Sequence, residues 1–290
     1  MTKEGSEGED ARRADDIEDA GEETGGSVVV EERGAVAAER RGALLFVRLE
    51  RPAKRNALTR AMLERLGEIF ARVAARRDLR AVVLSGAGPD FCAGTDIREL
   101  EGMDERAALD KARRGQEVCD RVELCGTPVV AAVQGAAAGG GCELALACHL
   151  RVAAAGARFQ LPEARLGVVP AYGGTQRLAR AVGSARALAA MIAGEEIGAE
   201  EALRLGLVNR VVREDRLTAE AESLARSIAE TAAPLAARAC LEAVTRGARL
   251  PLEEALRLEA ELFARLFSTE DVREGTRAFL EKRRPVFKGK

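Results

Sequence analysis

The sequence predicts an α/β protein in which strands alternate with helices. Three short apolar runs of strand length, Ala43–Leu49, Arg80–Leu84 and Pro128–Val133, follow one another along the chain. Between the first two, apolar residues recur at the three-to-four spacing of a helix, beginning after Thr59, which can cap that helix. Strands that alternate with helices form sheets covered by helices, so we expect a helix-covered sheet.

The C-terminal third has a different pattern, in which helices follow one another without strands. Two helical stripes are formed by Leu217, Ala221, Leu224 and Ile228 and by Leu252, Leu256, Leu262 and Phe263. The capping-box pattern Ser268-Thr-Glu-Asp271 predicts a third and last helix through Leu280. These apolar faces must be buried on the main domain or on another subunit. We therefore expect a core over residues 29–215 and a helical region over residues 216–290.

Residues 1–28 are expected to form a disordered acidic tail. The first 27 residues hold ten Asp/Glu, three Lys/Arg and five Gly, with almost no large apolar side chains. Such a segment buries too little apolar surface to offset its chain entropy. It lacks the basic and apolar character of a secretory or mitochondrial presequence, which predicts a cytoplasmic protein.

Composition argues against several functional classes. A net charge of −2 and an aromatic content of 3% do not favour nucleic-acid binding. No apolar stretch has the composition of a transmembrane helix, so no membrane partner is expected. Six cysteines without a CxxC pair, together with the single His149, do not make a usual zinc set. We expect the cysteines to be small buried hydrophobic residues and His149 to be a helix-end or packing residue.

Three glycine-containing segments mark a candidate active site. They are residues 91–97 (FCAGTDI), 134–144 (QGAAAGGGCEL) and 161–176, which contains Pro162-Glu163 and PAYGGTQ. Glycine lets backbone N–H groups approach a ligand, although for each segment alone tight turns and close packing are the favoured explanation. A phosphate loop fits these segments poorly, because no Gly-Lys-Ser/Thr follows. Glu143 lies in the first turn of an apolar helix, where a carboxylate is costly unless it is used.

Together these segments resemble the crotonase superfamily, specifically its enoyl-CoA hydratase branch, from about Val28 to Lys290. The matching segments in chain order are residues 51–58 (RPAKRNAL), 93–96 (AGTD), 139–143 (GGGCE), 162–163 (PE) and 173–178 (GGTQRL). The resemblance implies a crotonase-type spiral of ββα units with a C-terminal helical trimerisation region. It also implies a homotrimer, or a hexamer made of two trimers.

The resemblance implies an enzyme that adds water syn across the 2,3 double bond of a 2-enoyl-CoA, giving a 3-hydroxyacyl-CoA. The backbone N–H groups of Thr95 and Gly140 would hold the thioester oxygen as it gains negative charge, each worth about 3 kcal/mol. Glu143 and Glu163 would face the attacking water, and their environments should push the two pKa values apart. Ala171 replaces a glycine whose amide positions the water. No metal or other cofactor is implied, because coenzyme A enters as part of the substrate.

The resemblance also implies contacts to the CoA moiety. The Ala93 carbonyl would accept the adenine amino group. The other implied CoA contacts are Gly94, Asp96, Ile97, Lys54, Arg55, Phe279 and Lys282, with Arg98 as a further candidate for the phosphates. Phe279 and Lys282 would reach a CoA bound by the neighbouring subunit. The polar segment Glu99–Gln116 should border the acyl pocket, and we expect it to be mobile.

Two alternatives stay open. One is a different crotonase reaction, either double-bond isomerisation or hydration of a branched or cyclic enoyl-CoA. Keeping both Glu143 and Glu163 favours the hydratase, because water activation needs the second carboxylate. The other is a non-catalytic scaffold on the same frame that binds RNA or protein, against which the absence of a basic or aromatic patch argues.

Overall fold

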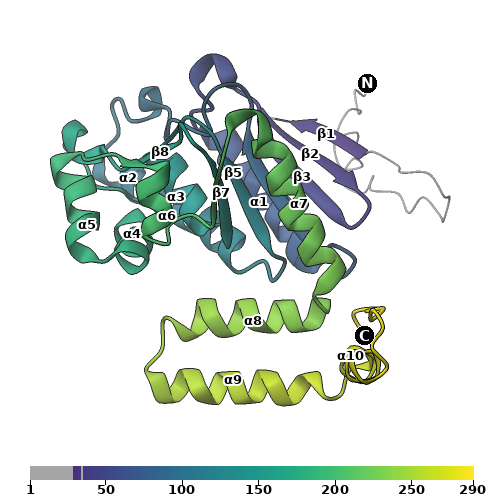
Figure 1. Cartoon of the computed structure of the whole chain (residues 1–290). Coiled ribbons are helices and arrows are strands. Elements are labelled where there is room, and N and C mark those ends of the chain that lie inside the picture. Colours follow the sequence, from purple (N-terminus) through teal and green to yellow (C-terminus); the bar gives the residue numbers. More distant parts are fainter. Residues whose placement is uncertain (1–28, 34) are drawn as a thin grey trace, which may run out of the picture.

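A computed structural model describes residues 29–33 and 35–290, so the predicted tail over residues 1–28 lies outside the described residues. The described chain has an α/β core with a group of helices at its C-terminal end (Figure 1). This arrangement confirms the predicted α/β class.

The main sheet of the described residues has the strand order β1-β2-β3-β4-β5-β7-β10. Its strands are β1 (Val29–Arg33), β2 (Val36–Arg41), β3 (Leu44–Leu49), β4 (Ala81–Gly86), β5 (Val129–Val133), β7 (Leu150–Ala154) and β10 (Arg210–Val212). The first three strands pair antiparallel, and all pairs from β3 onward are parallel. The three strands predicted from apolar runs are β3, β4 and β5.

A small second sheet lies next to the main one and joins two of the glycine-containing segments. It consists of β6 (Ala136–Ala138), β8 (Arg158–Gln160) and β9 (Ile197–Gly198). Isolated bridges pair Cys92 with Ala137 and Leu58 with Thr95. The segment around Thr95 is therefore fixed on both sides by backbone pairing.

Helices cover the core. They are α1 (Arg60–Ala75), α2 (Glu105–Glu123), α3 (Gly140–Ala147), α4 (Gly174–Val182), α5 (Ser184–Leu188), α6 (Ala199–Arg204) and α7 (Leu217–Thr231). Short helical turns are η1 (Pro52–Lys54), η2 (Ile97–Glu99), η3 (Glu163–Leu166), η4 (Ala189–Ala193) and η5 (Glu214–Arg216). The Thr59 side chain accepts the Met62 N–H at 3.3 Å, which confirms the predicted cap of α1.

The central strands β4 and β5 are buried on both faces of the main sheet, and alternate residues of each strand point to opposite faces. On β4, Val82 and Leu84 join the large core cluster that contains the apolar side of α1. Ala81 and Val83 belong instead to a second cluster, which includes Ala221 of α7. A fully buried Leu or Val contributes about 2 kcal/mol through removal of its apolar surface from water.

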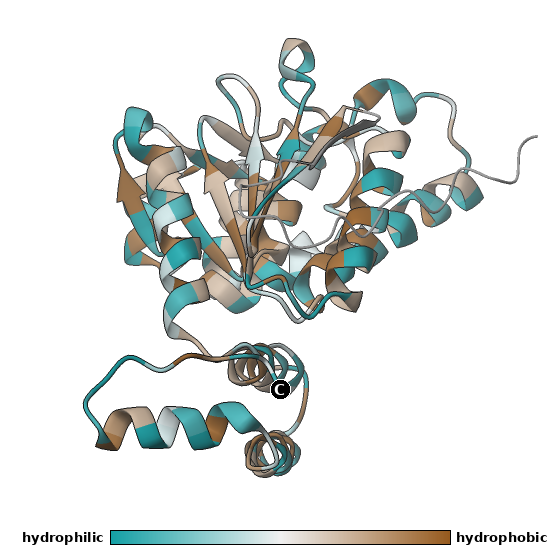
Figure 2. Ribbon diagram, turned by 90° about the vertical axis from the view of Figure 1, so that its right-hand side faces the viewer, coloured by the Kyte–Doolittle hydropathy of each residue, from teal (hydrophilic) through white to brown (hydrophobic). Residues whose placement is uncertain are grey.

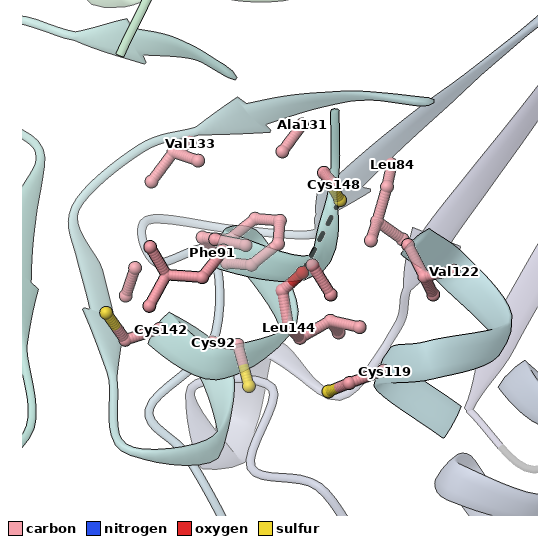
Figure 3. Close-up of a cluster of buried hydrophobic side chains, with 14 of the residues drawn as sticks. Leu84, Phe91, Cys92, Cys119, Val122, Ala131, Val133, Cys142, Leu144 and Cys148 are labelled. Carbon is pink, nitrogen blue, oxygen red and sulfur yellow. Dashed lines mark hydrogen bonds between the residues drawn. The ribbon is translucent and has the colours of Figure 1, made fainter. Parts of the chain in front are cut away.

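The cysteines are part of this packing, as predicted, with one exception. Figure 3 shows Cys92, Cys119, Cys142 and Cys148 among large apolar side chains near α3. Cys125 is also buried, whereas Cys240 is exposed, which corrects the expectation for that residue. Among the described residues, no group of His, Cys, Asp and Glu is arranged to hold a metal ion. Likewise, none of the described helices is long and apolar enough to cross a membrane.

His149 is a packing residue, as expected. Its Nδ1 accepts the Val129 N–H at 3.0 Å, and its Nε2 lies 2.9 Å from the Glu123 carbonyl oxygen. Burial lowers its pKa, so the ring is neutral and joins β5 to the end of α2.

The C-terminal region contains one helix more than predicted. After α7 come α8 (Pro234–Gly247), α9 (Leu252–Leu266) and α10 (Glu270–Leu280). The sequence did not lead us to expect α8, an alanine- and arginine-rich helix in which no residue is buried in the single chain. In Figure 1, α7 lies against the main sheet, whereas α8 and α9 form an antiparallel pair below the core. The division at residue 216 stays a prediction, and α7 packs with the core.

The start of α10 also differs from the prediction. Thr269, not Ser268, is its N-cap and accepts the Val272 N–H at 3.3 Å, so there is no capping box. The Asp271 carboxylate instead accepts the N–H groups of Lys288 and Gly289 at 2.7 and 2.9 Å. Asp271 thereby fastens the C-terminal segment to α10.

Several large apolar side chains of the C-terminal helices are exposed in the single chain. They are Val244, Leu252, Leu256, Phe263, Phe267, Phe279 and Leu280. Figure 2 shows such hydrophobic positions interspersed with hydrophilic ones along the helices beneath the core. Many large exposed apolar side chains in one region are typical of a surface that contacts another protein surface.

Candidate active site

Glu143 is held rigidly inside the core. All eight residues of α3 are buried, and Glu143 is 1% exposed. Its Oε1 accepts the N–H groups of Tyr172 and Gly174, both at 2.7 Å. A methyl group on Gly174 would lie 2.8 Å from the Glu143 Cγ, so only glycine allows this approach. The loop before α4 therefore fixes the position of the carboxylate.

Glu163 is the first residue of η3 and lies next to Gly139, the residue before α3. A methyl group on Gly139 would lie 2.9 Å from the Glu163 Oε1. The Glu163 Oε2 is buried and has no hydrogen-bond partner among the described residues. A buried carboxylate oxygen without a partner is costly and marks the place where a ligand or water binds.

The pKa values of both glutamates are raised to about 7. Burial is the main cause in each case. The amides of Gly174 and Tyr172 act in the opposite direction on Glu143, since they favour its ionised form. The negative charge of Glu143 instead raises the pKa of Glu163 further. These opposite influences favour a pair with Glu143 ionised and Glu163 protonated, whereas the predicted separation of the two pKa values stays a prediction.

The two predicted oxyanion-hole donors lie side by side. Gly94, with φ of +103°, turns the chain so that a methyl group on it would lie 3.4 Å from the Gly140 nitrogen. A methyl group on Gly140 would in turn lie 3.3 Å from the Thr95 Oγ1. In the described part of the chain, neither the Thr95 amide nor the Gly140 amide donates to a protein acceptor. Gly140 is the first residue of α3, where amides are free and the helix dipole favours negative charge.

Tyr172 is the site residue that the sequence reasoning missed. Its hydroxyl lies 3.1 Å from the Thr95 Oγ1, and its ring packs on Gly140. The signal available in the sequence was that Tyr172 is the single tyrosine of the chain and lies between Ala171 and Gly173 in a site segment. That signal is weak, because nothing local to Tyr172 indicates which neighbour its ring meets.

Only some of the residues predicted to contact CoA lie close to the proposed oxyanion hole. Ala93 and Gly94 adjoin Thr95, and the Ala93 N–H donates to the Arg55 carbonyl at 2.8 Å. The Arg55 guanidinium pairs with Asp90 at 2.7 Å, and Lys54 is exposed on η1 beside it. Arg98 and Ile97 are exposed, Ile97 at 61%.

Asp96 and the α10 residues are placed differently. Asp96 caps η2 and pairs with Arg51 at 2.7 Å, which gives it a structural role in the loop. The Arg51 hydrogen bond lowers its pKa, so it stays ionised. Phe279 is 83% exposed and lies with Lys282 at the end of α10, which Figure 1 places below the core. A single chain therefore does not bring these two residues to its own site.

The segment expected to be mobile, Glu99–Gln116, is largely helical, and its mobility stays a prediction. From Glu105 onward it forms α2, capped by the Asp104 side chain on the Ala107 N–H at 2.7 Å. The many charged residues of this segment concealed its helix in the sequence. In the structure, Gly115 and Val118 of α2 are buried. The Gln116 side-chain amide donates to the Ala171 carbonyl at 3.0 Å, so α2 borders the predicted water-positioning loop.

Comparison with known proteins agrees with this geometry. Residues 39–290 match the family described as enoyl-CoA hydratase/isomerase. A short-chain-enoyl-CoA hydratase of Clostridium acetobutylicum is 40% identical over 85% of this chain and 94% of its own length. An (E)-benzylidenesuccinyl-CoA hydratase of Thauera aromatica is 41% identical over 84% of this chain and 95% of its own.

Solved structures give the same result. The crystal structure of an enoyl-CoA hydratase from Bacillus anthracis superposes with a TM-score of 0.83 at 36% identity, covering 91% of this chain and 99% of that one. The core is therefore a crotonase-type fold. The chain belongs to the enoyl-CoA hydratase/isomerase family.

Proposed function

We propose that the chain is an enoyl-CoA hydratase. The observation that carries this proposal is a pair of carboxylates, the buried Glu143 and the half-buried Glu163, beside two backbone amides without a described protein acceptor, those of Thr95 and Gly140. Hydration of an enoyl thioester needs this combination, because negative charge develops on the thioester oxygen while protons move at the α- and β-carbons.

The proposed steps follow from the positions of these groups. The amides of Thr95 and Gly140 hold the thioester oxygen, and ionised Glu143 takes a proton from water as the water oxygen bonds to the β-carbon. The electrons of the double bond move to the thioester, giving an enolate, and Glu163 delivers its proton to the α-carbon. Proton transfer from Glu143 to Glu163 restores the starting state. The steps use proton transfers only, so we propose that no cofactor beyond the CoA of the substrate is needed.

The pH dependence of the reaction follows from the same pair. We expect kcat/KM to be highest near pH 7 and to fall on both sides. Below the pKa of Glu143, raised to about 7, this group is protonated and cannot accept a proton from water. Above the pKa of Glu163, also raised to about 7, no proton is left for the α-carbon. A profile that is flat from about pH 5 to about pH 9 contradicts this assignment.

The first experiment measures the loss of the conjugated enoyl-thioester absorbance when the purified protein meets crotonyl-CoA. Fast loss supports hydration. A protein that binds acyl-CoA but leaves crotonyl-CoA unchanged favours isomerisation or a branched or cyclic substrate. A protein that binds no acyl-CoA contradicts the enzyme assignment and favours the scaffold, for which salt-dependent retention of RNA is the matching assay.

We also propose a cytoplasmic homotrimer, or a hexamer of two trimers. The exposed apolar side chains of α9 and α10, including Phe263 and Phe279, support assembly because they need a covering surface. Assembly would also allow Phe279 and Lys282 to reach the CoA of a neighbouring subunit. Sedimentation of the purified protein tests this proposal, and a monomer at micromolar concentration contradicts it.

A further inference from the structure

We propose that Tyr172 determines acyl-chain specificity: its ring fills the space between α2 and the start of α3 and restricts the enzyme to short, slender acyl groups. This inference rests on the proposed hydratase function, since it concerns the acyl group of an enoyl-CoA.

The ring is enclosed by backbone on two sides. Tyr172 is 3% exposed. A methyl group on Gly115 of α2 would lie 1.9 Å from its Cδ1, and one on Gly140 of α3 would lie 2.9 Å from its Cε2. The phenol ring thus occupies the space that two glycines leave open, in contact with both helices. An acyl chain cannot pass between α2 and the oxyanion turn while the ring is there.

The ring is also held in place by polar contacts at both ends. Its backbone N–H donates to the Glu143 Oε1 at 2.7 Å, and its carbonyl accepts from the Arg177 Nη1 at 3.0 Å. At the far end, its hydroxyl lies 3.1 Å from the Thr95 Oγ1. Swinging the ring aside breaks the hydroxyl contact, which leaves the buried Tyr172 hydroxyl without this partner.

These contacts place the ring beside the reacting atoms. Thr95 and Gly140 hold the thioester oxygen in the proposed mechanism, and Glu143 activates the water that attacks the β-carbon. The ring touches Gly140 and Thr95, and its own backbone binds Glu143. A substrate whose thioester oxygen is held by these two amides therefore has its acyl group next to the ring.

The ring stays uncharged at any pH at which the enzyme works, because burial raises the pKa of Tyr172 to about 12. An apolar wall discriminates by size, and one methylene in such a pocket changes kcat/KM by roughly 10–200-fold. An enzyme whose pocket is closed by a phenol ring should therefore have a much higher kcat/KM for a four-carbon than for a ten-carbon substrate.

The test compares kcat/KM for crotonyl-CoA and trans-2-decenoyl-CoA in the full-length protein and in Tyr172→Ala and Tyr172→Phe. We expect wild type to favour crotonyl-CoA, Tyr172→Phe to retain the ratio, and Tyr172→Ala to shift it at least about 10-fold toward decenoyl-CoA. The ratio cancels a general loss of active enzyme. An unchanged ratio in Tyr172→Ala overturns the proposal, as does a wild type that prefers decenoyl-CoA.

A binding measurement keeps the test independent of turnover and of the folding of Tyr172→Ala. Because Tyr172 is the single tyrosine of the chain, biosynthetic 3-fluorotyrosine gives one ¹⁹F signal that reports on this ring. We expect butyryl-CoA to shift the signal and free CoA to leave it in place. A signal that saturating butyryl-CoA does not move overturns the proposal, even if crotonyl-CoA is hydrated. A shift by butyryl-CoA without hydration of crotonyl-CoA contradicts only the proposed function.

Discussion

Replacing Glu163 by Gln is expected to lower kcat for crotonyl-CoA hydration by about 10²–10⁴-fold, the usual contribution of a positioned acid–base group. Glu143→Gln should lose at least as much, because it removes the group that accepts the proton of water. The Oε2 of Glu163 is buried and unpaired, and its Oε1 lies next to Gly139 at the start of α3, the helix that carries Glu143. Steady-state kinetics on both variants measures the effect, and retention of more than about a tenth of wild-type kcat in either contradicts its role.

Stability measurements separate this loss from misfolding. A carboxyl with a raised folded pKa ionises more easily in the unfolded chain, so the free energy of unfolding falls as pH rises from about 4.5, the value in the unfolded chain, to about 7. The uncharged amide of Glu163→Gln removes the contribution of Glu163 to this dependence and leaves that of Glu143. We therefore expect Glu163→Gln to be at least as stable as wild type at pH 8. Glu200→Gln, at an exposed position on α6, is the matched control and should leave activity and stability unchanged.

Asn56→Ala is expected to destabilise the protein by about 3–5 kcal/mol, because one fully buried side chain satisfies four backbone groups. Its Nδ2 donates to the carbonyls of Ala87, Asp90 and Phe91 at 2.8, 2.9 and 3.2 Å. Its Oδ1 accepts the Arg51 N–H at 2.9 Å. Asn56 also has φ of +55°, a conformation that asparagine tolerates better than alanine. Urea unfolding at fixed pH measures the change.

The other asparagine provides the control for this variant. Asn209 is exposed and accepts a single hydrogen bond, from the Arg151 N–H at 2.8 Å. Asn209→Ala should cost only about 0.5–1.5 kcal/mol. Equal losses in the two variants contradict a special role for Asn56. Because Asn56 binds the carbonyl of Phe91, just before Ala93–Asp96, Asn56→Ala should also lower kcat in the fraction that stays folded.

Local patterns predicted much of the fold. Apolar runs located β3, β4 and β5, and the cap and the apolar spacing located α1. These predictions were possible because a buried strand or helix face requires apolar residues at a regular spacing in the sequence. The same logic failed for α8, which buries no residue in the single chain. It failed for α2 as well, where many charged residues concealed a narrow buried stripe around Val118.

Motifs in the sequence located the segments of the site but did not give every contact within them. Glu143 stands out as a carboxylate within an apolar helix, and Glu163 follows at the spacing of the family. Tyr172 and Asn56 act through partners far away in sequence, such as Gly115 and Ala87. Nothing in their immediate neighbours records these contacts, which arise only when the chain folds.

The two glutamates differ in how much the surrounding structure depends on them, so they should differ in how well they tolerate substitution. Residue 143 belongs to a helix without an exposed residue, so replacing it disturbs a packed interior and the two amides that it binds. Residue 163 begins a short turn in which no residue is buried, and one of its oxygens has no protein partner. Laboratory evolution toward a different proton-transfer reaction therefore has more freedom at residue 163. A library that varies this position and keeps Glu143 should yield mostly folded proteins with altered chemistry.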